Sequence, residues 1–206
     1  MNFKSTRIFI GGLLAAMMLS AVLAGSATAA PQWRFDGTPL EGEETIVGAA
    51  EKSSLTLTGM TTTCANFLYE IKIKNSGGVG TGSVTDLPLF NCTTDTKCTV
   101  EAIEPKSFPW TANLKEVSGK NYIVISGVHV KIVYGNPLCV LFETEVEVTG
   151  NAGGLIENTT ESATFNESSF SATGTKLNSF GTEVKWNGFF PAEAFQTKRE
   201  HKLTVS

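Results

Sequence analysis

Alternation of apolar and polar residues is the feature that most limits what this chain can fold into. In the segment FLYEIKIK, Phe67, Tyr69, Ile71 and Ile73 occupy every second position, and mostly polar residues lie between them. Successive side chains of a β-strand point to opposite faces of a sheet, so one face of this segment is apolar and the other is largely polar. The pattern predicts a strand with one face in the core and the other in solvent.

Similar runs recur along the chain at short intervals. They include SLTLTGMTTTC, KCTVEAIE, WTANLKEV, NYIVISGVHVKIVY, LCVLFETEVEV, SATFNES, FSATG, TEVKWNG and the closing HKLTVS. Turn-forming combinations of Gly, Asn and Pro separate them, as in NSGG, VSGK and YGNP. A short helical turn near Pro191 to Phe195 is the one helical element that we expect. The sequence therefore predicts an all-β protein, an antiparallel β-sandwich with an irregular β-barrel as the alternative.

Two of these runs predict a long hairpin. NYIVISGVHVKIVY and LCVLFETEVEV flank YGNP, which supplies residues typical of a turn. Pairing around Asn136 places His129 and Lys131 across from Glu143 and Glu145. Opposite charges that face each other across two strands contribute roughly 0.2–1 kcal/mol per pair.

The N-terminal segment predicts export from the cytoplasm. Two basic residues precede an uncharged run from Ile8 to Ala24, and small residues follow it as far as Ala29. This order is typical of a secretory signal peptide, for which we predict cleavage after Ala29. An uncleaved membrane anchor is the alternative, because the apolar run is nearly long enough to span a bilayer. We expect residues 1–29 to be the signal peptide and residues 30–206 to form a single secreted β domain.

The rest of the chain shows no sign of a second unit. Residues 30–40 are expected to form an extended arm, which Trp33 and Phe35 pin to the sheet. A domain boundary near TGNAGG (149–154) is an alternative, but every cysteine precedes it and the second part would then have no disulfide.

Charge and hydropathy limit the partners. Beyond the signal peptide, no stretch of sequence is apolar for long enough to span a membrane. The mature chain keeps 14 basic and 20 acidic residues, a net charge of −6, and carries no basic stripe. We therefore expect neither a nucleic acid nor an anionic membrane as partner, and we place the protein outside the cell or in the cell envelope.

The predicted mature chain contains four cysteines, Cys64, Cys92, Cys98 and Cys139. An even count in an oxidising compartment predicts two disulfides that staple the fold. Cys92–Cys98 with Cys64–Cys139 is the pairing that we expect first, which would make NCTTDTKC a stapled turn. The two other pairings remain open. A zinc site is not expected, because it would usually need CxxC pairs with histidines nearby.

The first candidate site combines His129 with the glutamates of the predicted hairpin. Glu143, Glu145 and Glu147 lie two residues apart on one strand, and His129 lies on its neighbour. Carboxylate and imidazole groups are ligands that divalent cations accept. A solvated face of balanced charge is the competing interpretation and the one that we favour, so we predict no metal and no other cofactor.

The second candidate site consists of aromatic residues that could stack on sugars. Trp110 and Trp186 are its main members, because each lies beside turn residues, in FPW and in WNGFF, where a loop would expose the ring. Trp33, Tyr134 and the pair Phe189–Phe190 would extend the platform. The competing interpretation is a place in the core, because each aromatic side chain buries a large apolar area.

Signatures of known catalysts are missing from the sequence. It contains no GxSxG, no HExxH and no complete set of lactamase motifs, and NSGGVGTGSVTD lacks the lysine of a phosphate-binding loop. We therefore do not expect an enzyme.

The signal peptide, the segment WRFDGTPL at the mature start, the scattered cysteines and the Thr- and Gly-rich β tail resemble uncharacterised secreted proteins of high-GC Gram-positive bacteria. The resemblance implies no activity and no functional residues. From the residues themselves we expect a non-catalytic β domain that binds an extracellular glycan or protein. A self-assembling structural protein of the envelope or matrix is the alternative, and a secreted hydrolase that uses carboxylates comes third.

Overall fold

The computed structural model describes residues 29–96, 98–135, 144–191, 195–196 and 202–206. Strands account for nearly all of the regular structure in these ranges, which confirms the predicted all-β class. The long strands are β3 (Glu43–Leu57), β4 (Met60–Ser76), β9 (Lys120–Tyr134), β10 (Glu145–Glu157) and β13 (Thr182–Pro191). The shorter strands are β1 (Trp33–Phe35), β2 (Thr38–Pro39), β5 (Val79–Asp86), β6 (Leu89–Thr94), β7 (Val100–Pro105), β8 (Trp110–Val117), β11 (Ser162–Phe165), β12 (Leu177–Ser179), β14 (Phe195–Gln196) and β15 (Leu203–Val205).

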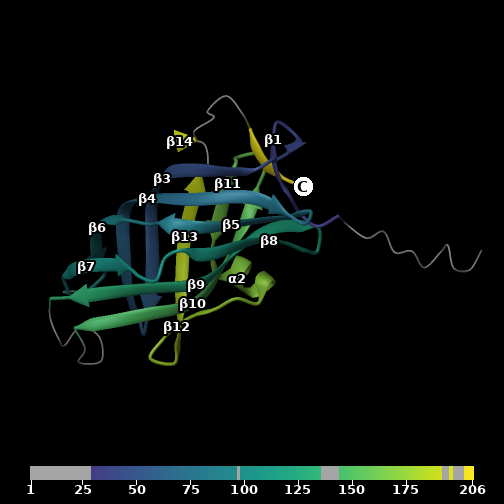
Figure 1. Cartoon of the computed structure of the whole chain (residues 1–206). Coiled ribbons are helices and arrows are strands. Elements are labelled where there is room, and N and C mark those ends of the chain that lie inside the picture. The colour runs from purple at the N-terminus through teal and green to yellow at the C-terminus, as the bar shows by residue number, and fades with distance from the viewer. Residues whose placement is uncertain (1–28, 97, 136–143, 192–194, 197–201) are drawn as a thin grey trace, which may run out of the picture.

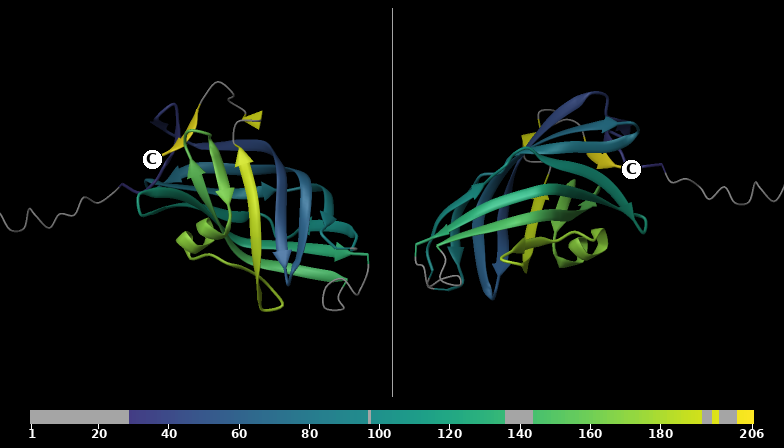
Figure 2. Two further views of the ribbon diagram at one scale, coloured as in Figure 1. Left: turned by 180° about the vertical axis from the view of Figure 1, so that it is seen from behind. Right: turned by 60° about the horizontal axis from the view of Figure 1, so that its bottom comes forward.

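Antiparallel neighbours follow one another around a closed path. β3, β4, β5, β8, β9 and β10 pair in that order, and β13 pairs with β3. β11 and β12 lie between β10 and β13 and pair with both, which completes the ring. Figure 1 shows β11 and β13 behind the broad wall that contains β4, β5, β8 and β9, and the left view of Figure 2 shows them from behind, in front of that wall. The fold is an antiparallel, sandwich-like structure whose two walls are joined at both edges. The segment TGNAGG (149–154) lies inside β10.

The alternation predicted for FLYEIKIK is confirmed in β4. Phe67, Tyr69 and Ile73 are buried, whereas Leu68 exposes 41% of its surface. Ile71 is partly buried and packs against the same core. Since the side chains of the buried face point into the ring, the core of the protein lies between the two walls.

The hairpin of β9 and β10 is confirmed, but its register differs from the prediction. Glu147 lies opposite Lys131 and Thr149 lies opposite His129, so the strands do not pair around Asn136. The buried faces still meet as predicted. Displacing a strand by an even number of residues leaves every side chain on its own face, so the alternation alone could not select this register.

The N-terminal arm forms a small separate sheet, in which β1 pairs with β15 and with β2. Trp33 is 5% exposed and Phe35 packs against the core, which confirms that both residues pin the arm. The side chain of Asn75 accepts the N–H of Trp33 and donates to the carbonyls of Trp33 and Leu40. This sheet lies at one end of the ring, beside the C-terminus (Figure 1).

Helix α2 (Glu167–Thr173) lies where the sequence analysis predicted the strand FSATG, and that prediction was wrong. Asn166 caps the helix in a reciprocal pair of hydrogen bonds with Ser169, and Gly174 ends it in the left-handed conformation with φ of 71°. The helical turn expected near Pro191 to Phe195 lies partly outside the described residues, and β14 begins at its last residue. Among the described residues, no helix is long and apolar enough to cross a membrane.

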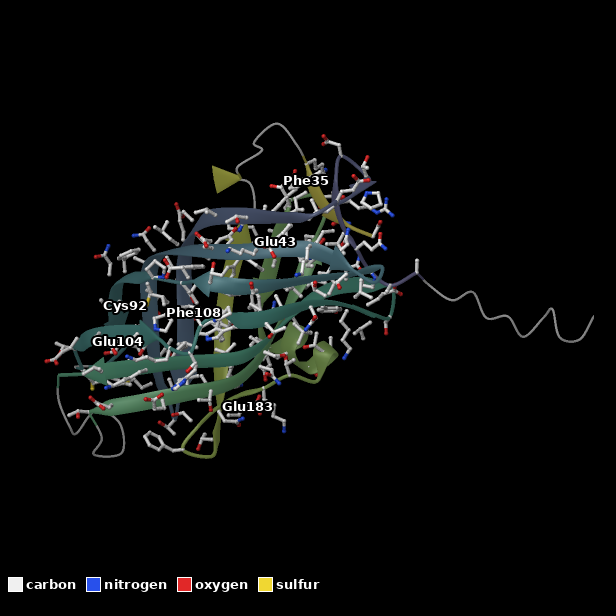
Figure 3. All side chains as sticks on the ribbon, viewed as in Figure 1. Phe35, Glu43, Cys92, Glu104, Phe108 and Glu183 are labelled. Carbon is white, nitrogen blue, oxygen red and sulfur yellow. A yellow bond between two sulfur atoms is a disulfide. The ribbon has the colours of Figure 1, made fainter. Side chains whose placement is uncertain are left out.

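A disulfide joins two neighbouring strands, so the predicted staple is confirmed, but its pairing was wrong. Cys64 on β4 lies directly opposite Cys92 on β6 and is bonded to it. Neither Cys92–Cys98 nor Cys64–Cys139 can then form. Cys98 is also disulfide-bonded, and Cys139 lies outside the described residues. The register of β4 and β6 places the sulfur atoms within bonding reach, and sequence spacing does not report that register. Figure 3 shows Cys92 on β6.

Candidate binding site

An apolar cavity of about 100 Å³ lies inside the ring of strands. Both walls contribute to its lining, and so do β1 and β15 of the small sheet at one end. Aromatic side chains form much of the lining, namely Trp33, Tyr69, Trp110, Phe165, Trp186 and Phe190. Most of the other lining residues are aliphatic. The chain has three tryptophans, and all of them belong to this lining.

Two of the aromatic rings lie over glycines. Gly48 on β3 is the register partner of Tyr69, and Gly154 on β10 is the register partner of Phe165. A Cβ atom added to Gly154 would lie 2.7 Å from Cζ of Phe165, and one added to Gly48 would clash with the ring of Tyr69. Glycine has no side chain, so these rings extend along the wall across the neighbouring strand. This placement helps to leave space at the centre of the ring of strands.

The polar atoms of the aromatic lining are already bonded within the protein. Each indole N–H and the Tyr69 hydroxyl donates to a protein acceptor, with the pairs Trp33 to Thr81, Trp110 to Lys106, Trp186 to Ser53 and Tyr69 to Pro191. Burial also raises the pKa of the Tyr69 hydroxyl above its ordinary value. The aromatic rings therefore present carbon atoms to the cavity.

Polar residues line the cavity at the end where β15 lies. Glu161 contributes the one carboxylate among the described lining residues. Its Oε2 atom accepts the backbone N–H of Leu203 at 2.9 Å. The hydroxyl of Ser162 is 2.7 Å from that of Thr160. A carboxylate thus lies at one end of a lining that is otherwise largely apolar.

The two tryptophans predicted to stack on sugars are in the cavity and not at the surface. Trp110 is 1% exposed and Trp186 is 7% exposed, so they form no surface platform. Of the other residues in that prediction, Trp33 and Phe190 line the same cavity, Tyr134 is buried and Phe189 is exposed. The turn residues beside Trp110 and Trp186 suggested that both rings are exposed. In the structure, the two side chains point to the buried faces of β8 and β13. A role for Trp110 and Trp186 in ligand binding stays a prediction, with the cavity as the site.

The predicted metal candidates do not come together. His129 contacts Glu147 through Nε2, whereas Glu145 pairs with Lys131 at 2.7 Å. Glu143 lies outside the described residues. In the described part of the chain, no group of three or more His, Cys, Asp or Glu side chains could hold a metal ion. The Lys131–Glu145 ion pair and the His129–Glu147 contact both lie on the outer face of β9 and β10.

The outer charged face continues onto β7 and the bend that follows it. A hydrogen bond from Lys106 holds the pKa of Glu104 below its usual value, and a hydrogen bond to Glu145 raises the pKa of Lys131. Ser107 Oγ lies 3.1 Å from His129 Nδ1, so serine, histidine and glutamate side chains are linked in a row. The row lies on the outer face of β9 and β10, outside the cavity. Figure 3 shows Glu104 on the side of the molecule away from the arm.

Sequence reasoning missed the cavity and Glu161. The signal of the cavity is the pairing of glycines with aromatic residues on neighbouring strands, and it becomes visible only once the strand register is known. In comparisons with known proteins, no family model, curated protein or solved structure matches this chain.

Proposed function

We propose that the protein is a non-catalytic binding protein that holds a small apolar molecule inside its ring of strands. The observation that carries the proposal is the cavity of about 100 Å³. The indole N–H groups of its tryptophans already donate hydrogen bonds to acceptors within the protein. Such a lining favours carbon-rich molecules, because a polar group placed against it would lose its bonds to water without replacement.

The energetic effect of the cavity supports the same proposal. Side chains around an empty apolar space lose van der Waals contacts. At about 24 cal/mol per Å³, a cavity of this volume costs roughly 2.4 kcal/mol of stability if it stays empty. Apolar cavities of roughly 150 Å³ in other proteins stay dry and take up molecules such as benzene. A bound ligand would recover the lost contacts.

The binding that we propose differs from the glycan binding expected from the sequence. A sugar platform needs exposed rings, whereas Trp110 and Trp186 are buried. Self-assembly is the weaker alternative, because every long strand of the described chain pairs on both sides and only short strands such as β6 and β7 lie at an edge. The Cys64–Cys92 disulfide supports the proposal that the protein acts outside the cytoplasm, after removal of residues 1–29.

Tryptophan fluorescence and thermal unfolding test the proposal directly. Because every tryptophan of the chain lines the cavity, emission reports on its occupancy without background from other sites. Toluene and cyclohexane serve as probes. We expect a saturable change in emission and a rise in the melting temperature with probe concentration. If neither probe gives a saturable response, the cavity does not bind apolar molecules and the proposal is wrong.

A pair of adjacent substitutions provides the matched control. Ala163 lines the cavity, so Ala163→Leu places extra carbon atoms in the space that a ligand would occupy. Thr164 follows it on β11 and its side chain points to the opposite face. We expect Ala163→Leu to abolish the response to the probes and Thr164→Leu to preserve it.

A further inference from the structure

We infer that the ligand is a small amphipathic amine, with its apolar body in the cavity and its ammonium group beside Glu161. The inference rests on the proposed function and adds the charge of the ligand to it.

The position of Glu161 is the first observation behind this inference. The residue lines the cavity, and its Oε2 atom is held by the backbone N–H of Leu203. Its Oε1 atom has no hydrogen-bond or ion-pair partner among the described residues. The hydrogen bond to Leu203 fixes the direction of the carboxylate, while Oε1 is left to accept a bond from a ligand.

The backbone of Glu161 is the second observation. Its φ of 46° lies in the left-handed region, where glycine and asparagine are more stable than glutamate. Seven other non-glycine residues of the described chain share a positive φ, and most of them lie in or beside turns. At Glu161 the conformation belongs to the turn between β10 and β11, and this turn holds the residue at the end of the cavity where β15 lies.

The charge of the lining selects the sign of the ligand. No lysine, arginine or histidine is among the described lining residues, so a carboxylate or phosphate would be repelled by Glu161 and would find no cation among those residues to pair with. An ammonium group would form a charge-assisted hydrogen bond with Glu161. It would also be attracted by the faces of nearby aromatic rings. An amine is therefore the class of ligand that uses both features of the lining.

The test compares probes that share one body and differ in charge. Phenylethylamine, ethylbenzene and phenylpropionate all carry a phenyl ring, with a positive, neutral and negative end respectively. We measure their dissociation constants on the purified protein at low salt by tryptophan emission and by calorimetry. We expect the amine to bind roughly tenfold tighter than ethylbenzene, and phenylpropionate to bind most weakly.

Two variants separate the role of the charge from that of the fold. Glu161→Gln keeps an oxygen that accepts the N–H of Leu203 and removes the negative charge. We expect it to lose the roughly tenfold preference for the amine while binding ethylbenzene as before. Glu157→Gln is the control, because Glu157 is exposed on the neighbouring β10 and does not line the cavity.

Each outcome decides between the two proposals. If ethylbenzene binds and the amine binds no tighter, the amine inference is overturned and the proposed function stands. Retention of the amine preference by Glu161→Gln would also overturn it. If none of the three probes binds, the inference falls together with the proposed function. The ratio between amine and neutral probe in the unaltered protein decides the matter even if Glu161→Gln does not fold.

Discussion

The ring of Tyr69 lies over Gly48, its register partner on the neighbouring strand β3. From this position the hydroxyl of Tyr69 donates to the carbonyl of Pro191 at the end of β13. The pair therefore links three strands across the wall of the cavity. A glycine is required at this point because a larger side chain would occupy the volume of the ring.

Gly48→Ala is expected to destabilise the fold by about 1–3 kcal/mol, because the added methyl group displaces the ring of Tyr69. Urea unfolding followed by circular dichroism measures the loss. Ala49→Ser, on the outer face of the same strand, is the control and should change stability by less than about 0.5 kcal/mol. Equal stability of Gly48→Ala and the unaltered protein would show that the ring is not over Gly48.

Ser53→Ala removes the acceptor of the Trp186 indole N–H, a buried hydrogen bond of 2.7 Å. The N–H is then left without a partner in the core, so we expect a loss of about 1–3 kcal/mol of unfolding free energy. The same urea titration applies. Ser54→Ala changes the next residue, whose side chain points to the other face, and should have little effect. A loss no larger than that of Ser54→Ala would argue against the bond.

The Cys64–Cys92 disulfide closes a loop with a sequence separation of 28. The chain-entropy model assigns about 3.5 kcal/mol of stability to a loop of this length. Peptide mapping without reduction should recover Cys64 and Cys92 in one cross-linked product, and the double substitution Cys64→Ala/Cys92→Ala should lower the urea midpoint accordingly. Recovery of a Cys92–Cys98 product instead would contradict the structure.

Alkaline pH should destabilise the protein through its buried tyrosines. Burial raises the pKa of Tyr69 and Tyr134 in the folded state above the ordinary value of 10.0. Below about pH 10 the tyrosines keep the proton in both the folded and the unfolded protein. Above it, the unfolded chain releases the proton more readily than the folded protein, so the free energy of unfolding falls as pH rises. We expect the unfolding free energy to be level up to about pH 10 and to decrease beyond it. Tyr69→Phe should make the decrease shallower, and an unchanged slope would show that Tyr69 does not contribute.

Several elements of the fold follow from local patterns in the sequence. The buried face of β4, with Phe67 and Ile73, is readable from alternation with a period of two. The pinning of the arm by Trp33 and Phe35 is readable from two aromatic residues in the segment WRFDGTPL. Helix α2 also had a local signal that was overlooked, since Asn166, Ser169 and Gly174 form both of its caps.

In strands such as β4, β9 and β10, the sequence by itself determined which residues face the core, because the direction of a side chain depends on the parity of its position in a strand. It also determined that strands would dominate and that a disulfide would staple them. Only the tertiary structure decided the register of β9 and β10, the partner of Cys92 and the cavity that Trp110 and Trp186 share. Each of these features depends on contacts between residues far apart in the chain, such as the hydrogen bond between Ser53 and Trp186. Alternation cannot select the register, because registers that differ by an even number of residues place the same side chains on the same faces.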